Sequence, residues 1–450
     1  MLFVNQSNLQ TKRYFSIHQS SLKKEIKKLK TKKWMFFVLP SSIVAEGLHI
    51  VIPLYVLFLG GSVVDVGIIV GLHYALSAIG AIFWGKIIDK YHVKRAILII
   101  CFSAITICSV ALFFIVDLNL VFIISSIAGF FIIGKNPVTQ ILVMESVPNN
   151  QWSRLFSRIS IITSIGSLTA FLVGSVWDAF FDLRPYFLFC AVVSIIATVL
   201  SIGVSSKSTI ERHTIVHSIH GIKHIFNHTR LNFQFIFTKI PHPHDFKPII
   251  TIFQRKMSHE IGVLFLTNFL FYFGSNIFFT AFIPFLKKYN FSNSEVFLVY
   301  MIQTMVLLTI FFFVPRVIAK ITEERATQVS YIPRILGIII AGSLIPITIG
   351  MNSLVMAVIA SCLMVSAFSI FSVSNSLIIF KTIPKGFEGT YLGVNSFMIG
   401  VGVFLGALTA GYVSNAISYT ASFTIAISIL LASLVMFRIY LRYRLSHRMI

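Results

Sequence analysis

Long apolar runs, separated by short polar stretches, fill the chain from residue 35 to residue 440. A run of about 20 apolar residues is long enough to cross the hydrocarbon core of a bilayer as a helix. The pattern predicts twelve such spans, at residues 35–59, 66–86, 96–116, 120–144, 159–181, 186–204, 260–286, 295–318, 334–351, 353–380, 391–414 and 421–440. Loops of a few residues between several of them make neighbouring helices antiparallel partners. The pattern therefore predicts an all-α integral membrane protein.

Two parts of the chain repeat the same landmarks. The interval from Pro148 to Gly166 in the first part equals the interval from Pro384 to Gly402 in the second. A membrane chain made of two matching halves is typical of secondary transporters, whose halves rock about a site near the middle of the bilayer. We therefore expect two six-helix halves related by a pseudo-twofold axis.

The apolar runs divide the chain into five regions. We expect a basic tail at 1–33, a first six-helix half at 34–204, a polar linker at 205–258, a second half at 259–440 and a basic tail at 441–450. In the linker, apolar residues recur at helical spacing opposite five histidines, His213, His217, His220, His224 and His228. This pattern is typical of an amphipathic helix at the membrane surface. Histidines at this spacing can also bind a metal in pairs, but no carboxylate or thiol completes a site, so we assign no metal and leave the question open.

The net charge of +22 is explained by the distribution of basic residues across the bilayer. With the N-terminal tail in the cytoplasm, most of the 37 Lys and Arg fall on cytoplasmic segments, as the positive-inside rule describes for short loops. Both termini are then cytoplasmic, and the chain is a multi-pass protein of the plasma or cytoplasmic membrane. No nucleic-acid partner is needed to explain the charge.

Composition excludes several other classes of protein. At 56% hydrophobic and 12% charged residues, the chain is far more apolar than a soluble protein of its length. The four cysteines lie singly inside apolar runs, where they serve as packing residues. No Gly-x4-Gly-Lys-Ser/Thr loop is present, which argues against a pump driven by ATP. No catalytic cluster of carboxylates, or of Ser and His, occurs within the spans, so we expect neither an enzyme nor a bound cofactor.

A charged motif lies between the second and third predicted spans. Residues 85–95 read Gly-Lys-Ile-Ile-Asp-Lys-Tyr-His-Val-Lys-Arg, a glycine with an aspartate four residues later and then a basic cluster. The motif resembles the signature loop of the major facilitator superfamily, and the chain resembles that family over about residues 34–440. The resemblance implies the twelve-helix fold of the family. It also implies that five residues latch the two halves in the outward-open state: Gly85, Asp89, Lys90, Lys94 and Arg95.

The sequence departs from the family pattern at two points of this motif. His92 stands where the family usually has a second glycine, so the turn differs locally. The corresponding segment of the second half, residues 315–320, lacks the aspartate, and we therefore expect a latch on one side only. A second interpretation treats these charges as topology signals without a gating role.

Small residues form a stripe along one face of two predicted helices. The stripe consists of Gly166, Ala170 and Gly174 in the fifth span and of Gly402 and Gly406 in the eleventh. Small residues at this spacing let helices approach closely in lipid, so we expect these residues to serve in helix packing. Antiporters of the family commonly carry Gly-Pro where this chain has Ala170 and a phenylalanine, which weakens an assignment as a multidrug antiporter.

Two ionisable residues lie inside predicted spans of the first half. Glu46 is near the middle of the first span, where a carboxylate costs about 2.5–3.5 kcal/mol to insert, so it should face protein or water. Lys135 is the matching cation in the fourth span, and His49 lies one helical turn from Glu46 on nearly the same face. Desolvation favours the neutral form of a carboxyl and a nearby cation favours its charged form. Glu46 can therefore carry the coupling proton or meet a cationic group of the substrate, with Lys135 competing for it and His49 assisting. The alternative is a fixed ion pair that joins the first and fourth helices.

Neutral polar residues complete the expected binding site. Asn136 and Gln140 lie near Lys135, and Asn276 and Asn375 lie in the seventh and tenth spans. Each can contact a substrate or bond a neighbouring helix. We expect no central charge in the second half and no arginine in the cavity. This distribution favours a small organic solute over a dianion.

These observations predict a secondary active transporter that moves a small organic solute by alternating access, coupled to protons. Its partners are the solute, protons and the lipid bilayer, and we expect a monomer. Two alternatives remain open. One is an efflux antiporter for a drug or metabolite, and the other is a receptor or scaffold of the same fold that transports nothing.

Overall fold

The structure is a computed structural model of the 450-residue chain, and it describes residues 33–91, 93–146, 152–177, 179–204, 258–383 and 388–446. Within these residues there are twelve segments that are helical, long and apolar enough to cross a membrane. The same residues contain no strand. The expected all-α membrane fold is therefore confirmed.

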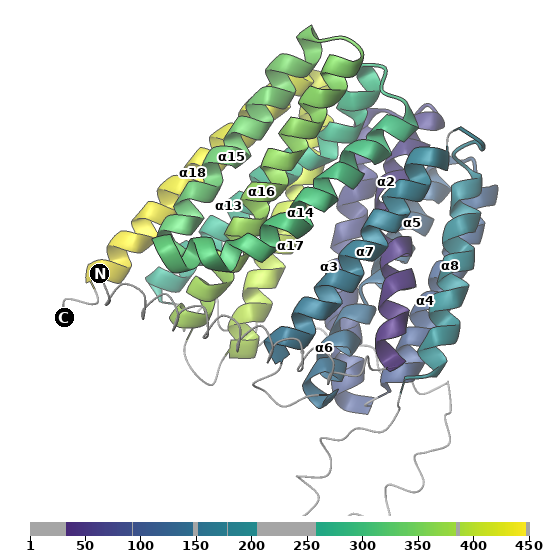
Figure 1. The fold of residues 1–450 in the computed structure, drawn as a ribbon, viewed down its shortest axis with the longest axis horizontal. Coiled ribbons are helices and arrows are strands. Elements are labelled where there is room, and N and C mark those ends of the chain that lie inside the picture. The colour runs from purple at the N-terminus through teal and green to yellow at the C-terminus, as the bar shows by residue number, and fades with distance from the viewer. Residues whose placement is uncertain are drawn as a thin grey trace, which may run out of the picture.

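The helices form two halves that lie side by side, the first in purple to teal and the second in green to yellow (Figure 1). The first half consists of a short 3-10 helix η1 (Lys33–Phe37), α2 (Val38–Phe58), α3 (Val63–Tyr91), α4 (Lys94–Phe114), α5 (Leu118–Ile132), α6 (Lys135–Ser146), α7 (Trp152–Trp177) and α8 (Pro185–Ile202). The second half consists of α13 (His259–Lys288), α14 (Asn293–Ile321), α15 (Glu323–Leu344), the 3-10 helix η6 (Ile345–Ile347), α16 (Met351–Thr382), α17 (Glu388–Ala416) and α18 (Tyr419–Ser446).

Helices of the two halves pack in the same pattern. In the first half α2 packs against α7 and α8, and in the second half α13 packs against α17 and α18. Between the halves, α3 packs against α17 and α14 packs against α7. Pairing α2 with α13, α3 with α14, α7 with α17 and α8 with α18 maps each of these contacts onto its counterpart. This correspondence is the pseudo-twofold arrangement that the repeated landmarks predict.

The fourth span is broken, although the apolar pattern predicts one continuous helix. The chain makes a tight turn at residues 133–134, and Lys135 is the first residue of α6 after it. Pro137 has no N–H to donate to the carbonyl of Ile133, which accepts from the amide of Asn136 at 3.0 Å instead. The proline therefore ends the regular helix, and Lys135 lies at the break.

The ninth span begins at Glu323 rather than at residue 334. Its first turn carries two acids, Glu323 and Glu324, which interact favourably with the positive end of the helix dipole. Polar residues thus extend this helix well beyond its apolar part. Arg334, which the apolar pattern places at the edge of a span, lies in the middle of α15.

The chain enters and leaves each half at one face, which we call the terminal face. The described residues begin there at Lys33 and end there at Ser446, and α8 ends and α13 begins at the same face. The opposite face carries short connections, and we call it the short-loop face. One of its turns is held by a capping box, in which the amide of Ser292 donates to Glu295 at 2.7 Å.

Glycines let two parallel helix pairs approach closely, one pair in each half. A Cβ added at Gly166 of α7 would lie 2.7 Å from Cβ of Ser42 on α2. A Cβ added at Gly402 of α17 would lie 2.8 Å from the carbonyl oxygen of Phe269 on α13. Side chains do not tolerate such distances, so a larger residue at either glycine must push the helices apart.

The other residues of the small-residue stripes have different neighbours. Ala170 is buried, and its carbonyl accepts from the hydroxyl of Tyr186 at 2.9 Å. Gly174 lies directly against the ring of Phe297 on α14, so it packs across the interface between the halves. Gly406 packs within the second half, where an added Cβ would lie 2.7 Å from a carbonyl oxygen of α13.

The two halves touch at the short-loop face and separate towards the terminal face. A Cβ added at Gly67 of α3 would lie 2.7 Å from the carbonyl oxygen of Ala407 on α17. One turn further along α3, the nearest atom to a Cβ on Gly71 is a ring carbon of Phe404 at 3.4 Å. Gly85 lies on the same face of α3 as Gly67, since a whole number of helical turns separates them. Among the described residues, nothing lies within 4 Å of a Cβ added at Gly85. The space between the halves is therefore closed at the short-loop face and open at the terminal face.

Candidate functional site

Glu46 lies in the middle of α2 and is half-buried. Residues one turn away show which way it faces. Ser42 lies against Gly166 of α7, and Nε2 of His49 is 3.1 Å from the hydroxyl oxygen of Tyr74 on α3. Because positions 42, 46 and 49 share one face of a helix, Glu46 lies between α7 and α3. These are the two helices of the first half that make the most extensive contacts with the second half.

Lys135 lies near Glu46 but forms no ion pair with it. The Lys135 ammonium donates to the carbonyl oxygen of Ser41, with 3.2 Å between Nζ and O. Its charge still acts on Glu46 through space. The carboxyl of Glu46 has no hydrogen-bond partner among the described residues. The expected contact between first and fourth spans is therefore made through the backbone of α2, and it leaves the carboxyl of Glu46 open to a proton or a ligand.

A small groove lies between α2 and α3, and its lining includes His49, one turn from Glu46. Its walls are mostly aliphatic, and its polar residues are His49, His73 and Tyr74. Nδ1 of His73 is 3.1 Å from the carbonyl oxygen of Ser125, so Nδ1 carries the proton and Nε2 is the acceptor. Tyr74 lies on the same face of α3 as the glycines that meet α17, so the groove borders the interface between the halves.

The four neutral residues expected at the site have different surroundings. Asn136 and Gln140 are exposed on α6. Asn276 donates to the carbonyl oxygen of Val403 on α17 at 2.7 Å, so it bonds two helices of the second half. Asn375 is buried in α16, and its Oδ1 has no hydrogen-bond partner among the described residues. Of the four residues, Asn375 is therefore the buried one whose side-chain oxygen is an unused hydrogen-bond acceptor.

An arginine lies deep inside the second half. Arg334 of α15 is 2% exposed. Its Nε donates to the hydroxyl of Ser275 on α13 at 3.0 Å, and its Nη1 donates to the carbonyl oxygen of Met364 on α16 at 2.7 Å. The ring centres of Phe271 and Phe279 lie 5.1 and 5.2 Å from the guanidinium carbon. The expectation that the second half has no central charge is therefore wrong.

The motif at 85–95 is divided between two helices. Gly85, Asp89 and Lys90 belong to α3, whereas Lys94 and Arg95 begin α4. The side chains of Asp89 and Lys90, and the whole of His92, lie outside the described residues. Lys94 is 1% exposed and forms an ion pair with Glu145 of α6, and Arg95 is exposed. In this conformation Lys94 thus joins two helices of the same half.

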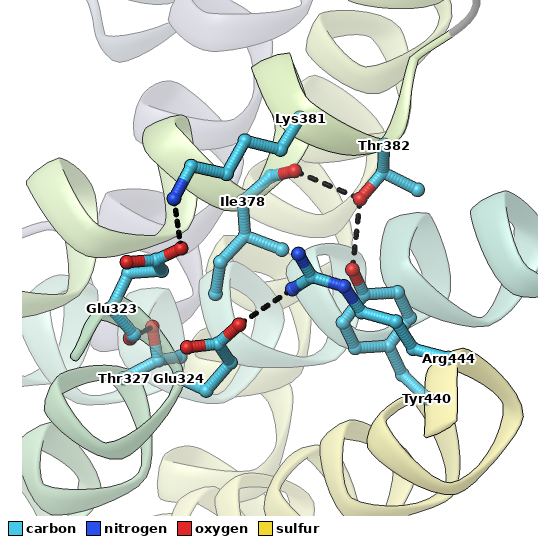
Figure 2. A network of polar contacts seen from close by, with 8 residues as sticks. All are labelled: Glu323, Glu324, Thr327, Ile378, Lys381, Thr382, Tyr440 and Arg444. Atoms are coloured by element: carbon cyan, nitrogen blue, oxygen red, sulfur yellow. Dashed lines mark hydrogen bonds and ion pairs between the residues drawn. The ribbon is translucent and has the colours of Figure 1, made fainter. Parts of the chain in front are cut away.

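Charged residues also join three helices of the second half at the terminal face, as Figure 2 shows. Glu323 at the start of α15 forms an ion pair with Lys381 of α16. Glu324 accepts from Arg444 of α18, with 2.7 Å between Nη1 and Oε1. The second half lacks the aspartate of the motif, but the next helix begins with two acids that take part in ion pairs. The motif alone does not reveal these acids.

The ion pairs at the terminal face follow the pseudo-twofold symmetry with their signs exchanged. In the first half Lys94 starts the third span and binds Glu145 near the end of the fourth. In the second half Glu323 starts the ninth span and binds Lys381 near the end of the tenth. Each pair lies within one half, so it stabilises that half without joining it to the other.

The histidine stripe expected at 213–228 lies outside the described residues. Among the residues that the structure does describe, no group of three His, Cys, Asp or Glu side chains is placed to hold a metal ion.

Comparison with known proteins places the fold. The sequence profile of the Major Facilitator Superfamily matches residues 33–398. No curated protein matches the chain. Solved structures with this fold include the nucleoside transporter NupG, at 14% identity and a TM-score of 0.68 over 91% of this chain and 98% of that one. They also include a POT family transporter in complex with 5-aminolevulinic acid, at 17% identity and a TM-score of 0.68 over 91% and 96%.

A third similar structure is the xylose transporter XylE from E. coli in an inward open conformation, at 15% identity and a TM-score of 0.62 over 90% and 93%. At these identities the solved structures show the fold alone. The profile covers most of the chain, including all but the last part of the second half. The chain is therefore a multi-pass membrane protein and belongs to the major facilitator superfamily of transporters.

Proposed function

We propose that the protein moves a small organic solute across the cytoplasmic membrane by alternating access, driven by protons. The observation that carries this proposal is the carboxyl of Glu46, which is half-buried in the middle of a span and faces the interface between the halves without a hydrogen-bond partner among the described residues. A carboxylate at the bilayer centre costs about 2.5–3.5 kcal/mol, so its presence indicates a function. Taking up a proton removes the charge and lets the site close.

The terminal face is the cytoplasmic face in this proposal. Basic residues at the described helix ends of that face outnumber those of the short-loop face, where Arg184, Lys287 and Lys288 lie. This asymmetry follows the positive-inside rule. With this orientation the space between the halves is open to the cytoplasm and closed to the outside, so the conformation is inward-open.

In the proposed cycle, Glu46 binds a proton from outside and releases it to the cytoplasm. When the carboxyl is charged, Lys135 can leave the carbonyl of Ser41 and approach it, and protonation of Glu46 reverses this movement. His49 is held by Tyr74 one turn away and can pass the proton along the groove. The solute binds between the halves. Further candidate contacts for it are the neutral hydrogen-bonding groups of Asn136, Gln140 and Asn375.

The test is transport by Glu46→Gln in liposomes, with a solute found by screening an expressing strain for changes in growth and toxicity. The wild-type protein should accumulate the solute when a proton gradient is imposed. Glu46→Gln should still exchange labelled solute at equal concentrations on both sides, because exchange needs no net proton movement. It should not accumulate the solute. Accumulation by Glu46→Gln would show that Glu46 does not couple transport to protons.

Asp182→Asn is a matched control, because Asp182 is an exposed acid in a short loop. It should both exchange and accumulate the solute. A wild-type protein that moves none of the screened solutes in either direction would favour the alternative of a receptor or scaffold. The direction of accumulation separates uptake from efflux.

A further inference from the structure

The proposed proton cycle makes no use of Arg334. The described residues offer its five N–H donors two acceptors, the hydroxyl of Ser275 and the carbonyl of Met364. Both acceptors are neutral, and no carboxylate pairs with the guanidinium in the described part of the chain. Two neutral acceptors and two ring faces only partly offset the free energy of removing a cation from water. Such a charge inside the membrane indicates that an anion meets it at some stage.

Arg334 lies one layer of side chains away from the space between the halves. Tyr272, Asn276 and Phe279 share one face of α13, and all three are half-buried. Tyr272 packs against α16 through Phe368, and Asn276 bonds α17, so this face lies between those two helices. The helix itself also contacts α2 and α3 of the first half. The face therefore borders the space between the halves.

The side chains on this face also contact the guanidinium. The ring of Phe279 lies 5.2 Å from the guanidinium carbon of Arg334. The ring of Tyr272 packs edge-on against the ring of Phe271, which itself lies 5.1 Å from the guanidinium carbon. Tyr272 is half-buried, so a ligand between the halves that displaced its side chain would come within reach of the guanidinium.

The charges in the middle of the described spans do not balance. Glu46 is the acid there, and Lys135 and Arg334 are the bases. Charges act over long distances where the dielectric constant is low. When Glu46 is ionised, one positive charge is left over, and when Glu46 is protonated, two are. The excess positive charge therefore attracts a ligand with one negative charge into the space between the halves. This attraction is stronger when Glu46 is protonated than when it is ionised.

We propose that the transported solute is an organic monoanion with a carboxylate, and that Arg334 is the residue of the second half that binds this group. The inference rests on the proposed transport function and names its class of substrate. The planar guanidinium matches the two oxygens of a carboxylate, which a lysine does not. Protonation of Glu46 then raises the affinity for the anion, so the proton and the solute bind together.

A purely structural Arg334 would clamp α13, α15 and α16, and the two roles predict opposite effects on stability. Replacing an unpaired buried charge with an apolar side chain of similar length removes a desolvation penalty. Arg334→Met should therefore keep or raise the melting temperature if the charge serves a ligand. If the charge is a clamp, Arg334→Met should lower the melting temperature by several degrees.

The experiment measures melting temperatures of the full chain in lipid nanodiscs with matched acids and amides. The probes are benzoate and benzamide, nicotinate and nicotinamide, and N-acetylglycine and its amide. At least one acid should raise the melting temperature of the wild-type protein where its amide does not. Arg334→Met should lose this shift. Arg334→Lys keeps the charge but loses the planar guanidinium that can donate two parallel hydrogen bonds to a carboxylate. The acid concentration needed for the shift should therefore rise roughly tenfold.

Arg438→Met is the matched control, because Arg438 is exposed near the terminal face of α18. It should keep the shift. The proposal is wrong if no acid acts differently from its amide on the wild-type protein, if Arg334→Met keeps the shift, or if Arg334→Met itself melts several degrees lower. Binding needs no flux, so these results are separate from those of Glu46→Gln in liposomes.

Discussion

The interface between the halves differs between its two ends. At the short-loop face, α3 and α17 meet backbone to backbone, and a Cβ added at Gly67 would lie 2.9 Å from Cα of Gly411. At the terminal face, no atom of the described residues lies within 4 Å of a Cβ added at Gly85 of the same helix. There the described ion pairs, such as Lys94–Glu145, lie within one half. Direct contact therefore holds one end closed, while at the other end each half is held together on its own and can move separately.

The largest effect is expected from Gly67→Trp, which breaks the closed end. A tryptophan cannot fit against the backbone of α17, and overpacking of this kind costs about 3 kcal/mol at the upper end of the usual range. A penalty of that size reduces the population of the state that is closed at the short-loop face by roughly 100-fold. Transport in liposomes should be lost, because the protein can no longer close at the short-loop face.

Gly85→Trp tests the same helix at the open end. In this conformation no atom of the described residues lies within 4 Å of a Cβ at position 85, so the melting temperature should stay near that of the wild-type protein. If α3 and α17 meet at this end in the opposite state of the transport cycle, transport should fall here too, because the protein stays open at the terminal face. Normal transport by Gly67→Trp would contradict the account of the closed end.

The second prediction concerns the rigidity of the first half at the open end. Lys94 and Glu145 are 1% and 8% exposed, and replacing Lys94 removes a cation that contacts the buried carboxylate of Glu145 directly. We expect Lys94→Gln to reduce the free energy of unfolding by about 3 kcal/mol. Thermal unfolding in detergent measures the effect. A melting temperature equal to that of the wild-type protein would show that this pair does not stabilise the half.

The smallest effect is expected from Lys381→Gln, which removes the lysine of the corresponding ion pair in the second half. Lys381 is 53% exposed, and exposed ion pairs contribute about 0–1 kcal/mol. We therefore expect a destabilisation of less than about 1 kcal/mol, and a weaker effect as salt is added. A loss as large as that of Lys94→Gln would mean that the network of Figure 2 is less accessible to water than its exposure indicates.

The pattern of apolar runs and the repeated landmarks in the sequence predict the fold well, because the bilayer requires long apolar helices and the duplication fixes their arrangement. They fail where polar residues extend or break a helix. Arg334 escapes notice because the apolar run before it is interrupted, although Glu323 and Glu324 mark the true start of α15. The break before Lys135 could be found from Pro137, which removes a helical hydrogen bond.

Side-chain pairing in the candidate site is less predictable than the fold. Helical spacing places Glu46 and His49 on one face, and the contact of His49 with Tyr74 on α3 agrees with that placement. Spacing cannot show that Lys135 binds the carbonyl of Ser41, because that contact joins residues 94 positions apart. The same is true of His73, whose bond to Ser125 fixes its tautomer.

The reactivity of a cysteine at position 49 tests most directly whether the face of α2 that carries Glu46 lies in water between the halves. The measurement uses a chain whose four native cysteines are replaced by alanine. His49 is exposed one turn from Glu46, and in the proposed cycle both lie between the halves in contact with water. His49→Cys should react with a membrane-impermeant thiol reagent added at the terminal face, and Gly67→Trp should make it reactive from the short-loop face. Reaction with a lipid-soluble reagent alone, in both backgrounds, would place this face of α2 against lipid and contradict the proposed cycle.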